Sequence, residues 1–395
     1  MEHSGRRRWW AILASASLVT SGLAGLPAAA APSPEENGSG GSIDADVSAE
    51  LQAEGRADVW VRFAERPDMS QFAAIADWNE RGQAVVDALQ AAADSSQGTL
   101  QASLDEQGMD YEAFWATNAI RVSAADADLV SSMALAAGVE GIYPTTEIEV
   151  PEIVPATPEM APNAVEWGIA DINAPEVWGD GHDGEGIVVA SIDTGAQWDH
   201  PALINQYRGY NGPGDVDHNY SWFDHAGTRP APTDSNGHGS HVTGTMVGTD
   251  GGDNQIGVAP GAKWIAANGC CPSDAALYAS GEWMLEPTDL NGENPDVSKR
   301  PHIINNSWGT TLPSNDPFMA DIIEAWAAAG QFGLARGGSG VGGVHHQPGE
   351  AAGQHGRLHG HVGAALVLYR HAGAVEGALH GLHEGGAGGV GGEGE

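Results

Sequence analysis

A continuous apolar run that ends in an acid, residues 186–193 (GIVVASID), constrains the fold more than any other stretch of the sequence. Such a run is typical of a strand buried on both faces, as the strands of a parallel sheet are. Residues 261–267 and 302–305 have the same character. Helical patterns lie between and after these strands, at 241–247, 274–284 and 318–329. The alternation predicts an α/β fold with a doubly wound parallel sheet, whose sites lie at the carboxyl ends of the strands.

Residues 57–150 follow a different pattern, in which strands and a few helices alternate over a short distance. Polar and apolar residues alternate in 58–63, as in a strand. Residues 72–107 repeat apolar positions at helical spacing, with Gly98 as a candidate break. A second strand, a short helix and a third strand are expected at 111–123, 126–137 and 141–150. This predicts a small α+β domain of the ferredoxin-like type.

Three segments have the composition of processing or linker sequences. Residues 1–31 combine a basic start, an apolar run and an Ala-x-Ala cleavage site, which predicts a signal peptide and a secreted protein. Residues 32–56 are expected to be a disordered linker, because their first part is rich in Pro, Gly, Ser and acids. Residues 151–163 hold four prolines and predict an extended, cleavable hinge. The α/β domain is then expected at 164–332.

Charge and cysteine content exclude some partners. The chain has 53 acids and 16 bases, and its net charge of -37 argues against nucleic acid or an anionic membrane as a partner. The two cysteines, Cys270 and Cys271, are adjacent and cannot join distant parts of the fold. Two thiols are too few for a zinc site, so we expect them to do no redox or metal work. We expect a monomer.

The polar, glycine-rich loop 234–245 (DSNGHGSHVTGT) delivers a histidine, His238, to the start of a helix of small residues. Asp193 ends the buried strand and is its natural partner, since a histidine held in one tautomer by a carboxylate is a general base for a serine hydroxyl. The end of the strand expected at 302–305 could pair with a peptide substrate. Its candidate substrate-binding residues are Asn305, Ser307, Trp308 and Gly309. Taken singly, these features also fit a helix N-cap, a loop histidine and a turn.

Four segments carry characteristic motifs in order. They are 189–195 (VASIDTG) with 200–203 (HPAL), 238–245 (HGSHVTGT), 256–262 (IGVAPGA) and 303–309 (IINNSWG). Together they resemble the aspartate motif, the histidine motif, the segment after it and the cleft-lining strand of the subtilases, the subtilisin-like serine proteases. The order Asp, His, Ser is that of subtilisin. The insert at 273–300 is similar to the bacillopeptidase F-like branch.

The resemblance implies a secreted serine endopeptidase precursor that acts on protein or peptide substrates. Asp193 would orient His238, and His238 would deprotonate the nucleophilic serine. Residues 57–150 look like the family's propeptide, which templates folding and inhibits the protease until the hinge is cut. The implied chemistry requires no cofactor. Asp-rich loops at 215–219 and 250–254 allow structural calcium, but they define no ligand set.

The resemblance ends near residue 332. Neither the family's Ala-Gly-Asn stretch, which supplies the oxyanion-hole Asn, nor its Gly-Thr-Ser-Met-Ala motif, which carries the nucleophile, occurs in the chain. Residues 331–395 hold 21 Gly and 8 His but no Asp, Asn or Thr, which is typical of a GC-rich gene read in another frame. We therefore expect a frameshift near 330–340. A genuine Gly/His tail that binds metal and another recombination are alternatives. Ser339 lacks a helix pattern after it, so we identify no nucleophile. The alternative interpretation of the chain as written is a catalytically inactive subtilase.

Overall fold

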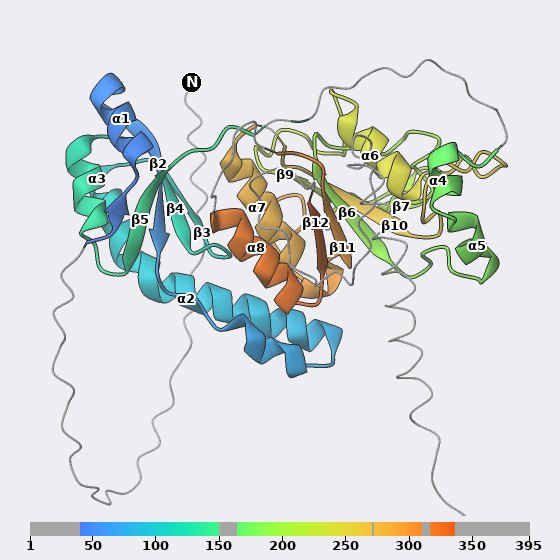
Figure 1. Ribbon diagram of the computed structural model, residues 1–395, viewed down its shortest axis with the longest axis horizontal. Helices are drawn as coiled ribbons and strands as arrows, with labels where there is room; N and C mark the ends of the chain where they lie inside the picture. Colours follow the sequence, from blue (N-terminus) through green and yellow to red (C-terminus); the bar gives the residue numbers. More distant parts are fainter. Residues whose placement is uncertain (1–39, 149, 151–163, 271, 310–316, 336–395) are drawn as a thin grey trace, which may run out of the picture. The chain divides into compact units, whose positions relative to one another are not determined.

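Two five-stranded sheets organise the chain, one in an N-terminal domain and one in an α/β domain (Figure 1). The computed structural model describes residues 40–148, 150, 164–270, 272–309 and 317–335. The predicted signal peptide, hinge and Gly/His tail lie outside the described residues. Among the described residues, none of the helices is both long and apolar enough to cross a membrane.

The N-terminal sheet has the strand order β1-β5-β2-β4-β3 and is antiparallel except for the β1–β5 pair. Its strands are β1 (Ser42–Ile43), β2 (Ala57–Phe63), β3 (Tyr111–Phe114), β4 (Ala119–Ala125) and β5 (Val139–Pro144). Its helices are α1 (Ala45–Glu54), the 3₁₀ helix η1 (Met69–Ala74), α2 (Trp78–Gln107) and α3 (Ala127–Ala134). Residues that alternate along β2 divide between two apolar clusters. Val59, Val61 and Phe63 pack in the domain's own core, whereas Trp60 faces the other way.

Three predictions for this domain are corrected by the structure. The expected strand at 111–123 is a hairpin, because Asn118 takes the left-handed conformation (φ 45°) and turns the chain between β3 and β4. Part of the expected linker 32–56 is helix α1, which Asp44 caps and which buries Val47. Gly98 does not break α2, which continues for 30 residues.

The sheet of the α/β domain is entirely parallel, with the order β12-β11-β6-β10-β9. Its strands are β6 (Val188–Asp193), β9 (Trp222–Asp224), β10 (Lys263–Asn268), β11 (Ile303–Asn306) and β12 (Phe332–Ala335). The predicted α/β class is confirmed, and β6, β10 and β11 lie where the apolar runs place them. Strands β9 and β12 were not predicted, and β12 crosses the boundary that we set at residue 332, because these edge strands are too short to show a pattern.

Helices cover both faces of this sheet. On β6, Val189 packs with α6 (His238–Val247), whereas Ala190 and Ile192 belong to the cluster that contains α7 (Asp274–Leu285) and α8 (Pro317–Ala328). The remaining elements are small. They are α4 (Trp167–Asp171), α5 (Ala174–Gly179), the hairpin β7 (Tyr210–Gly212) with β8 (Asp215–Val216), and the 3₁₀ helix η2 (Val297–Lys299). The double coverage explains why β6 is apolar on both faces.

The two domains share one apolar cluster. Trp60 of β2 is fully buried, and its ring lies 5.0 Å from that of Phe114 in its own domain. Across the junction, the same ring lies 4.9 Å from Tyr278 of α7 and 5.3 Å from Phe318 of α8. The face of the N-terminal sheet that carries Trp60 therefore packs against α7 and α8.

Candidate active site

Asp193 is the last residue of β6, the central strand of the parallel sheet, and its side chain is fully buried. The backbone N–H of Thr194 donates to Asp193 Oδ1 over 2.7 Å. Backbone donors of this kind stabilise the ionised form of a carboxylate inside a protein. The apolar strand therefore ends in an acid that is kept away from water.

His238 begins α6 and is 4% exposed. Its Nδ1 lies 2.8 Å from Asp193 Oδ1, although the two residues are 45 positions apart in the chain. A carboxylate on Nδ1 leaves Nε2 as the nitrogen that can accept a proton. The structure thus brings together the acid and the base that the sequence pairs.

Two glycines allow the two loops to approach this closely. A Cβ on Gly239 would lie 2.0 Å from the carbonyl oxygen of Gly195, and a Cβ on Gly195 would lie 2.0 Å from that of Thr233. Gly195 also has φ +105°, a conformation that L side chains rarely adopt. Both positions require glycine, because any side chain would push the histidine loop away from the aspartate loop.

Asp234 holds the histidine loop in shape, and the sequence analysis gave it no role. Its Oδ1 accepts from the backbone of Gly237 over 2.8 Å and from the hydroxyl of Thr194 over 2.9 Å, and its Oδ2 accepts from Ser240 N over 2.8 Å. Thr194 Oγ1 in turn accepts from the backbone N–H of Gly239. One carboxylate thereby joins the residue after Asp193 to the first turn of α6. In the sequence, only its position four residues before His238 could have indicated this role.

The candidate substrate residues lie at the end of β11, beside β6. Asn305 pairs with Ser191 in the sheet, two residues before Asp193. Asn305 and Trp308 are buried, and Asn305 Nδ2 donates to Ser307 Oγ over 2.9 Å. Ser307 and Gly309 are partly exposed. The stretch is therefore accessible at Ser307 and Gly309, and an exposed strand end is a place where an extended peptide can pair.

Three acids on α7 and α8 were also missed by the sequence analysis, and all three bind the N-terminal domain. Asp274 Oδ2 accepts from Trp60 Nε1 and from the backbone of Thr146, each over 2.8 Å. Asp321 accepts from Arg62 over 2.6 Å. Glu282 accepts from the backbone N–H of Ala116 over 2.8 Å. Their donors are between 128 and 259 positions away, so no local pattern in the sequence could reveal them.

Glu282 has a pKa well above the usual range of a glutamate. Burial raises the pKa of its carboxyl to about 8, against the lowering effect of the backbone N–H groups of Ala116 and Trp115. Glu112 of β3 and Glu286 at the end of α7 raise this pKa further. His225 lies 3.4 Å from Glu112 across the same junction. The carboxyl of Glu282 is therefore largely protonated at neutral pH while the two domains are in contact.

No group of three or more acids, histidines or cysteines that could hold a metal ion occurs among the described residues. Cys270 is buried and disulfide-bonded.

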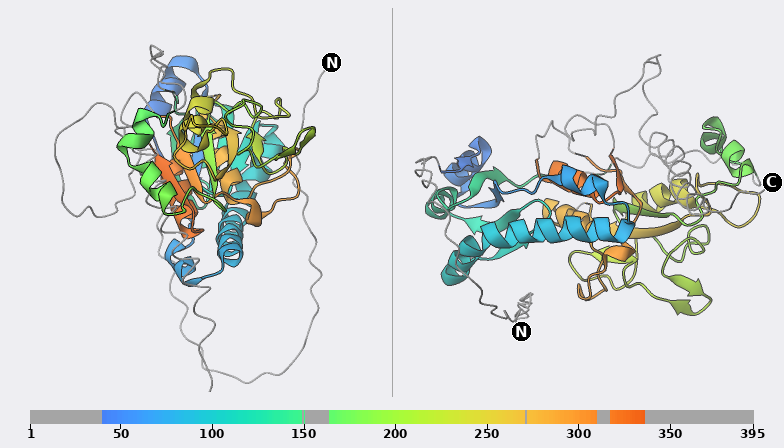
Figure 2. Two further views of the ribbon diagram at one scale, coloured as in Figure 1. Left: turned by 90° about the vertical axis from the view of Figure 1, so that its right-hand side faces the viewer. Right: turned by 90° about the horizontal axis from the view of Figure 1, so that it is seen from below.

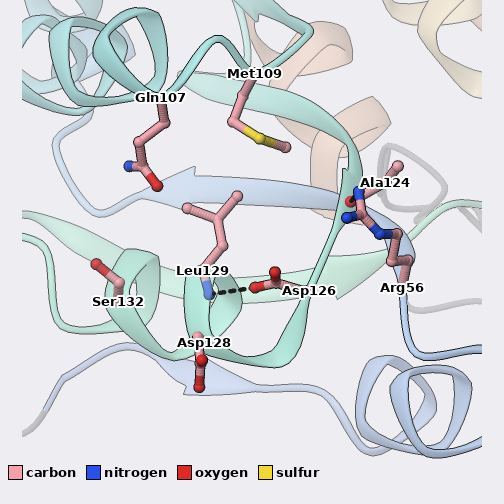
Figure 3. Close-up of a pocket in the computed structure, with 8 residues that line it drawn as sticks. All are labelled: Arg56, Gln107, Met109, Ala124, Asp126, Asp128, Leu129 and Ser132. Atoms are coloured by element: carbon pink, nitrogen blue, oxygen red, sulfur yellow. Dashed lines mark hydrogen bonds between the residues drawn. The ribbon is translucent and has the colours of Figure 1, made fainter.

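A pocket of about 290 Å³ opens on the N-terminal domain and contains none of the candidate site residues (Figure 3). Its acid Asp126 accepts from the backbone of Leu129 and caps α3, and Arg56 donates to the carbonyl of Ala124. These side chains hold the local fold together. We assign no function to this pocket.

A buried carboxylate–imidazole pair at the carboxyl edge of a parallel sheet is two thirds of the triad that defines serine peptidases. Residues 184–351 match the model of the subtilase family, which contains this pair. Over this segment the chain is similar to the subtilase family of subtilisin-like serine peptidases. The match extends past residue 332, where the recognisable motifs end.

Curated relatives agree with this assignment. The chain is 47% identical over 178 residues to bacillopeptidase F of Bacillus subtilis (strain 168), a match that covers 44% of this chain and 12% of the relative. It is 33% identical over 165 residues to the major intracellular serine protease of the same strain, covering 42% of this chain and 46% of that one. The chain thus spans less than half the length of these two relatives. Among solved structures, fervidolysin from Fervidobacterium pennivorans overlaps with a TM-score of 0.45 and 16% identity, over 74% of this chain and 41% of that one.

Proposed function

We propose that this chain derives from the secreted precursor of a subtilisin-like serine endopeptidase. The observation that carries the proposal is the 2.8 Å contact between His238 Nδ1 and Asp193 Oδ1 inside a segment of the subtilase family. The predicted signal peptide supports export. The mechanism needs no cofactor, and a protein or peptide is the substrate.

In the proposed reaction, His238 Nε2 removes the hydroxyl proton of a serine as its oxygen attacks the scissile carbonyl. Asp193 stabilises the imidazolium that forms. The proton then passes to the departing amine, an acyl-enzyme remains, and water releases it by the same route. The backbone near residues 307–309 holds the substrate in extended form. His238, oriented by Asp193, carries out the proton transfers, and the serine and the oxyanion-hole Asn must come from elsewhere.

We propose that the N-terminal domain is a propeptide of ferredoxin-like type. Its succession β2-α2-β3-β4-α3-β5 and the order β5-β2-β4-β3 within its sheet support this. Its sheet packs against α7 and α8, and it donates hydrogen bonds to the acids Asp274, Glu282 and Asp321. A parallel sheet forms slowly because its contacts are non-local, so a domain that binds two of its helices can speed folding.

The nucleotide sequence across the codons for residues 330–340 tests the origin of the C-terminal composition. We expect the +1 frame to encode an oxyanion Asn and a Gly-Thr-Ser-Met-like motif. If that frame contains no such motif, the frameshift is wrong.

Activity is tested with a fluorophosphonate probe on two proteins, the chain as written and the frame-restored chain. We expect labelling of the restored chain alone, since loss of the serine lowers kcat about 10⁶-fold in subtilisin, a relative. Labelling of the chain as written, at Ser339, would contradict the view that this chain lacks a nucleophile. A His238→Ala variant of the restored chain is the control, and its labelling should fall sharply.

A further inference from the structure

Helix α2 is longer than the sheet of its own domain requires (Figures 1 and 2). Leu100 and Leu104 in its C-terminal half belong to the core of the N-terminal domain. Val85, Val86 and Leu89 in its N-terminal half belong instead to the cluster shared with α7 and α8. Thirty residues of helix span about 45 Å, so the two halves of α2 can serve two different partners.

We propose that residues 69–90, here called the α2 arm, form a second docking contact with the subtilase domain. The surface that receives the arm, here called the platform, consists of residues 297–302 and the C-terminal end of α8. Its apolar residues join the cluster that contains Trp60, whereas its contacts with Arg300, His302 and the end of α8 are additional to those of the sheet. The arm therefore extends the contact of the N-terminal domain beyond the sheet.

Arg300 is the centre of the platform and is 2% exposed. Its guanidinium carbon lies 3.9 Å from the ring centroid of Trp78, the first residue of α2, and the same group donates to the Trp78 carbonyl oxygen. The indole of Trp78 stacks on the imidazole of His302, with 5.0 Å between the ring centroids. Burial lowers the pKa of Arg300 to about 10, and the nearby charge of Arg81 lowers it further. An indole face and carbonyl oxygens compensate in part for the hydration that the cation loses.

Gly82 provides the space for Arg300. A Cβ on Gly82 would lie 2.4 Å from the guanidinium carbon of Arg300. Glycine inside a helix destabilises it by roughly 1 kcal/mol relative to alanine, so this position is explained by the contact and not by helix stability. Gly98, in the same helix, has nothing within 4 Å of the Cβ position and serves as a matched comparison.

Arg81 connects the arm to the end of α8. Its side chain donates to the backbone carbonyls of Ala327 and Ala328, the last turn of that helix. A cation at a helix C-terminus satisfies carbonyls that have no partner in the helix and is favoured by the helix dipole. Farther along the arm, Gln90 donates to Glu286 at the end of α7 over 2.9 Å.

The platform therefore selects a particular kind of partner. It fits a helix that presents an aromatic residue in its first turn, a basic residue and a glycine three and four positions later, and apolar residues on the same face beyond them. In this chain those positions are Trp78, Arg81, Gly82, Val85, Val86 and Leu89. A side chain in place of this glycine would displace the guanidinium of Arg300 and weaken its contacts with Trp78.

The test uses the full chain with a recognition sequence for a site-specific protease placed within residues 151–163. After cleavage by the added protease, size-exclusion chromatography at a series of concentrations gives the dissociation constant of the two fragments. We expect the wild-type fragments to elute together. Gly82→Ala should raise the dissociation constant roughly 10- to 100-fold, the range for losing hydrogen bonds and a stacking contact of a charged group.

Gly98→Ala is the matched control and should leave the dissociation constant within about twofold of wild type. Equal dissociation constants for wild type and Gly82→Ala, or equal losses in Gly82→Ala and Gly98→Ala, would overturn the proposal. Hydrogen exchange on the uncut chain gives a second readout. In Gly82→Ala, amides of residues 78–90 should exchange faster while those of 97–104 stay protected, and unchanged exchange in the arm would also overturn it.

The inference rests on the proposed function only in treating 151–163 as the segment that is cut. Because an added protease makes the cut and the readout is binding, an inactive chain gives the same result as an active one. Failure of the arm and failure of the peptidase assignment are therefore distinguishable.

Discussion

Two buried carboxylates, Asp193 and Glu282, show how the same chemical group serves different purposes in two regions of the molecule. Asp193 ends a central strand and contacts the imidazole of His238, a group that can carry the opposite charge. Glu282 lies on α7 against backbone N–H groups of the N-terminal domain, with Glu112 and Glu286 nearby. A buried acid beside a base can support proton transfer, whereas a buried acid among other acids binds a proton whenever the contact forms.

The largest expected effect is the loss of kcat in variants of Asp193 and its partner His238. In the frame-restored enzyme, His238→Ala should lower kcat about 10⁶-fold and Asp193→Asn about 10⁴-fold, as the equivalent changes do in serine peptidases of this mechanism. Steady-state hydrolysis of a peptide substrate measures both. Glu282→Gln in the same enzyme, assayed after removal of the N-terminal domain, should change kcat by less than about threefold. If Glu282→Gln lowered kcat as much as Asp193→Asn does, Glu282 would take part in catalysis and the proposed difference between the two acids would be wrong.

The next effect concerns Trp60 at the junction. Trp60→Ala should lower the free energy of unfolding of the full chain by about 3–5 kcal/mol, because it leaves a cavity and removes one of the two hydrogen bonds to Asp274 Oδ2. Denaturant titration measures the change. The control is Trp167→Ala, since Trp167 is 69% exposed and its loss should matter by less than about 0.5 kcal/mol. Similar losses in the two variants would show that the junction contributes little to stability.

The contact between the two domains is expected to depend on pH through Glu282. The pKa of Glu282 is raised to about 8 in contact, whereas a free glutamate has its ordinary value of 4.5. Glu282 therefore takes up a proton when the two domains bind each other at neutral pH. The binding between the domains is strongest below pH 4.5, where Glu282 is protonated in both states. The binding weakens as the pH rises from 4.5 to 8, and above pH 8 the stabilisation linked to this proton is lost. The raised pKa of Glu286, also caused by burial, acts in the same direction.

We expect the dissociation constant of the cut fragments to increase with pH across this window by the equivalent of a few kcal/mol, on the order of the pKa difference. Glu282→Gln should remove much of the slope, because an amide keeps an acceptor oxygen and cannot ionise. Glu140→Gln is a suitable control, since Glu140 bonds Arg62 at the exposed margin of the junction. An unchanged slope in Glu282→Gln would assign the pH dependence to other groups, with the His225–Glu112 pair the first to examine.

The smallest effect is expected at Asp234. Asp234→Ala should lower the stability of the α/β domain by about 1 kcal/mol, since three backbone N–H groups at the start of α6 lose their acceptor. Proton NMR adds a local readout, because the strongly hydrogen-bonded Nδ1 proton of His238 gives a resonance far downfield. We expect that resonance to broaden in Asp234→Ala and to persist in Asp250→Ala, a control in an exposed loop. A resonance that is unchanged in Asp234→Ala would show that the loop holds His238 without this carboxylate.

Local signals explain which parts were predicted. Strands β6, β10 and β11 were found because burial on both faces leaves a continuous apolar run. The hairpin of β3 and β4 was read as one strand because the turn depends on Asn118, whose side chain bonds Ser96, Gln97 and the carbonyl of Glu65. Helix α1 was read as a linker because Val47 is its sole fully buried residue. In both errors a single residue, Asn118 or Val47, makes the contact that decides the structure, and one residue leaves no periodic pattern in the sequence.

By itself the sequence predicted the α/β class, the pairing of Asp193 with His238 and the similarity to the subtilase family, because each depends on residues within a short motif or strand. Only the tertiary structure decided what the remaining acids do. Asp274, Glu282 and Asp321 look like ordinary helix acids in the sequence, yet each accepts hydrogen bonds from a domain more than 120 positions away. The physical reason is that a motif records chemistry shared by neighbouring residues, whereas burial and its effect on pKa arise from which distant surfaces exclude water together.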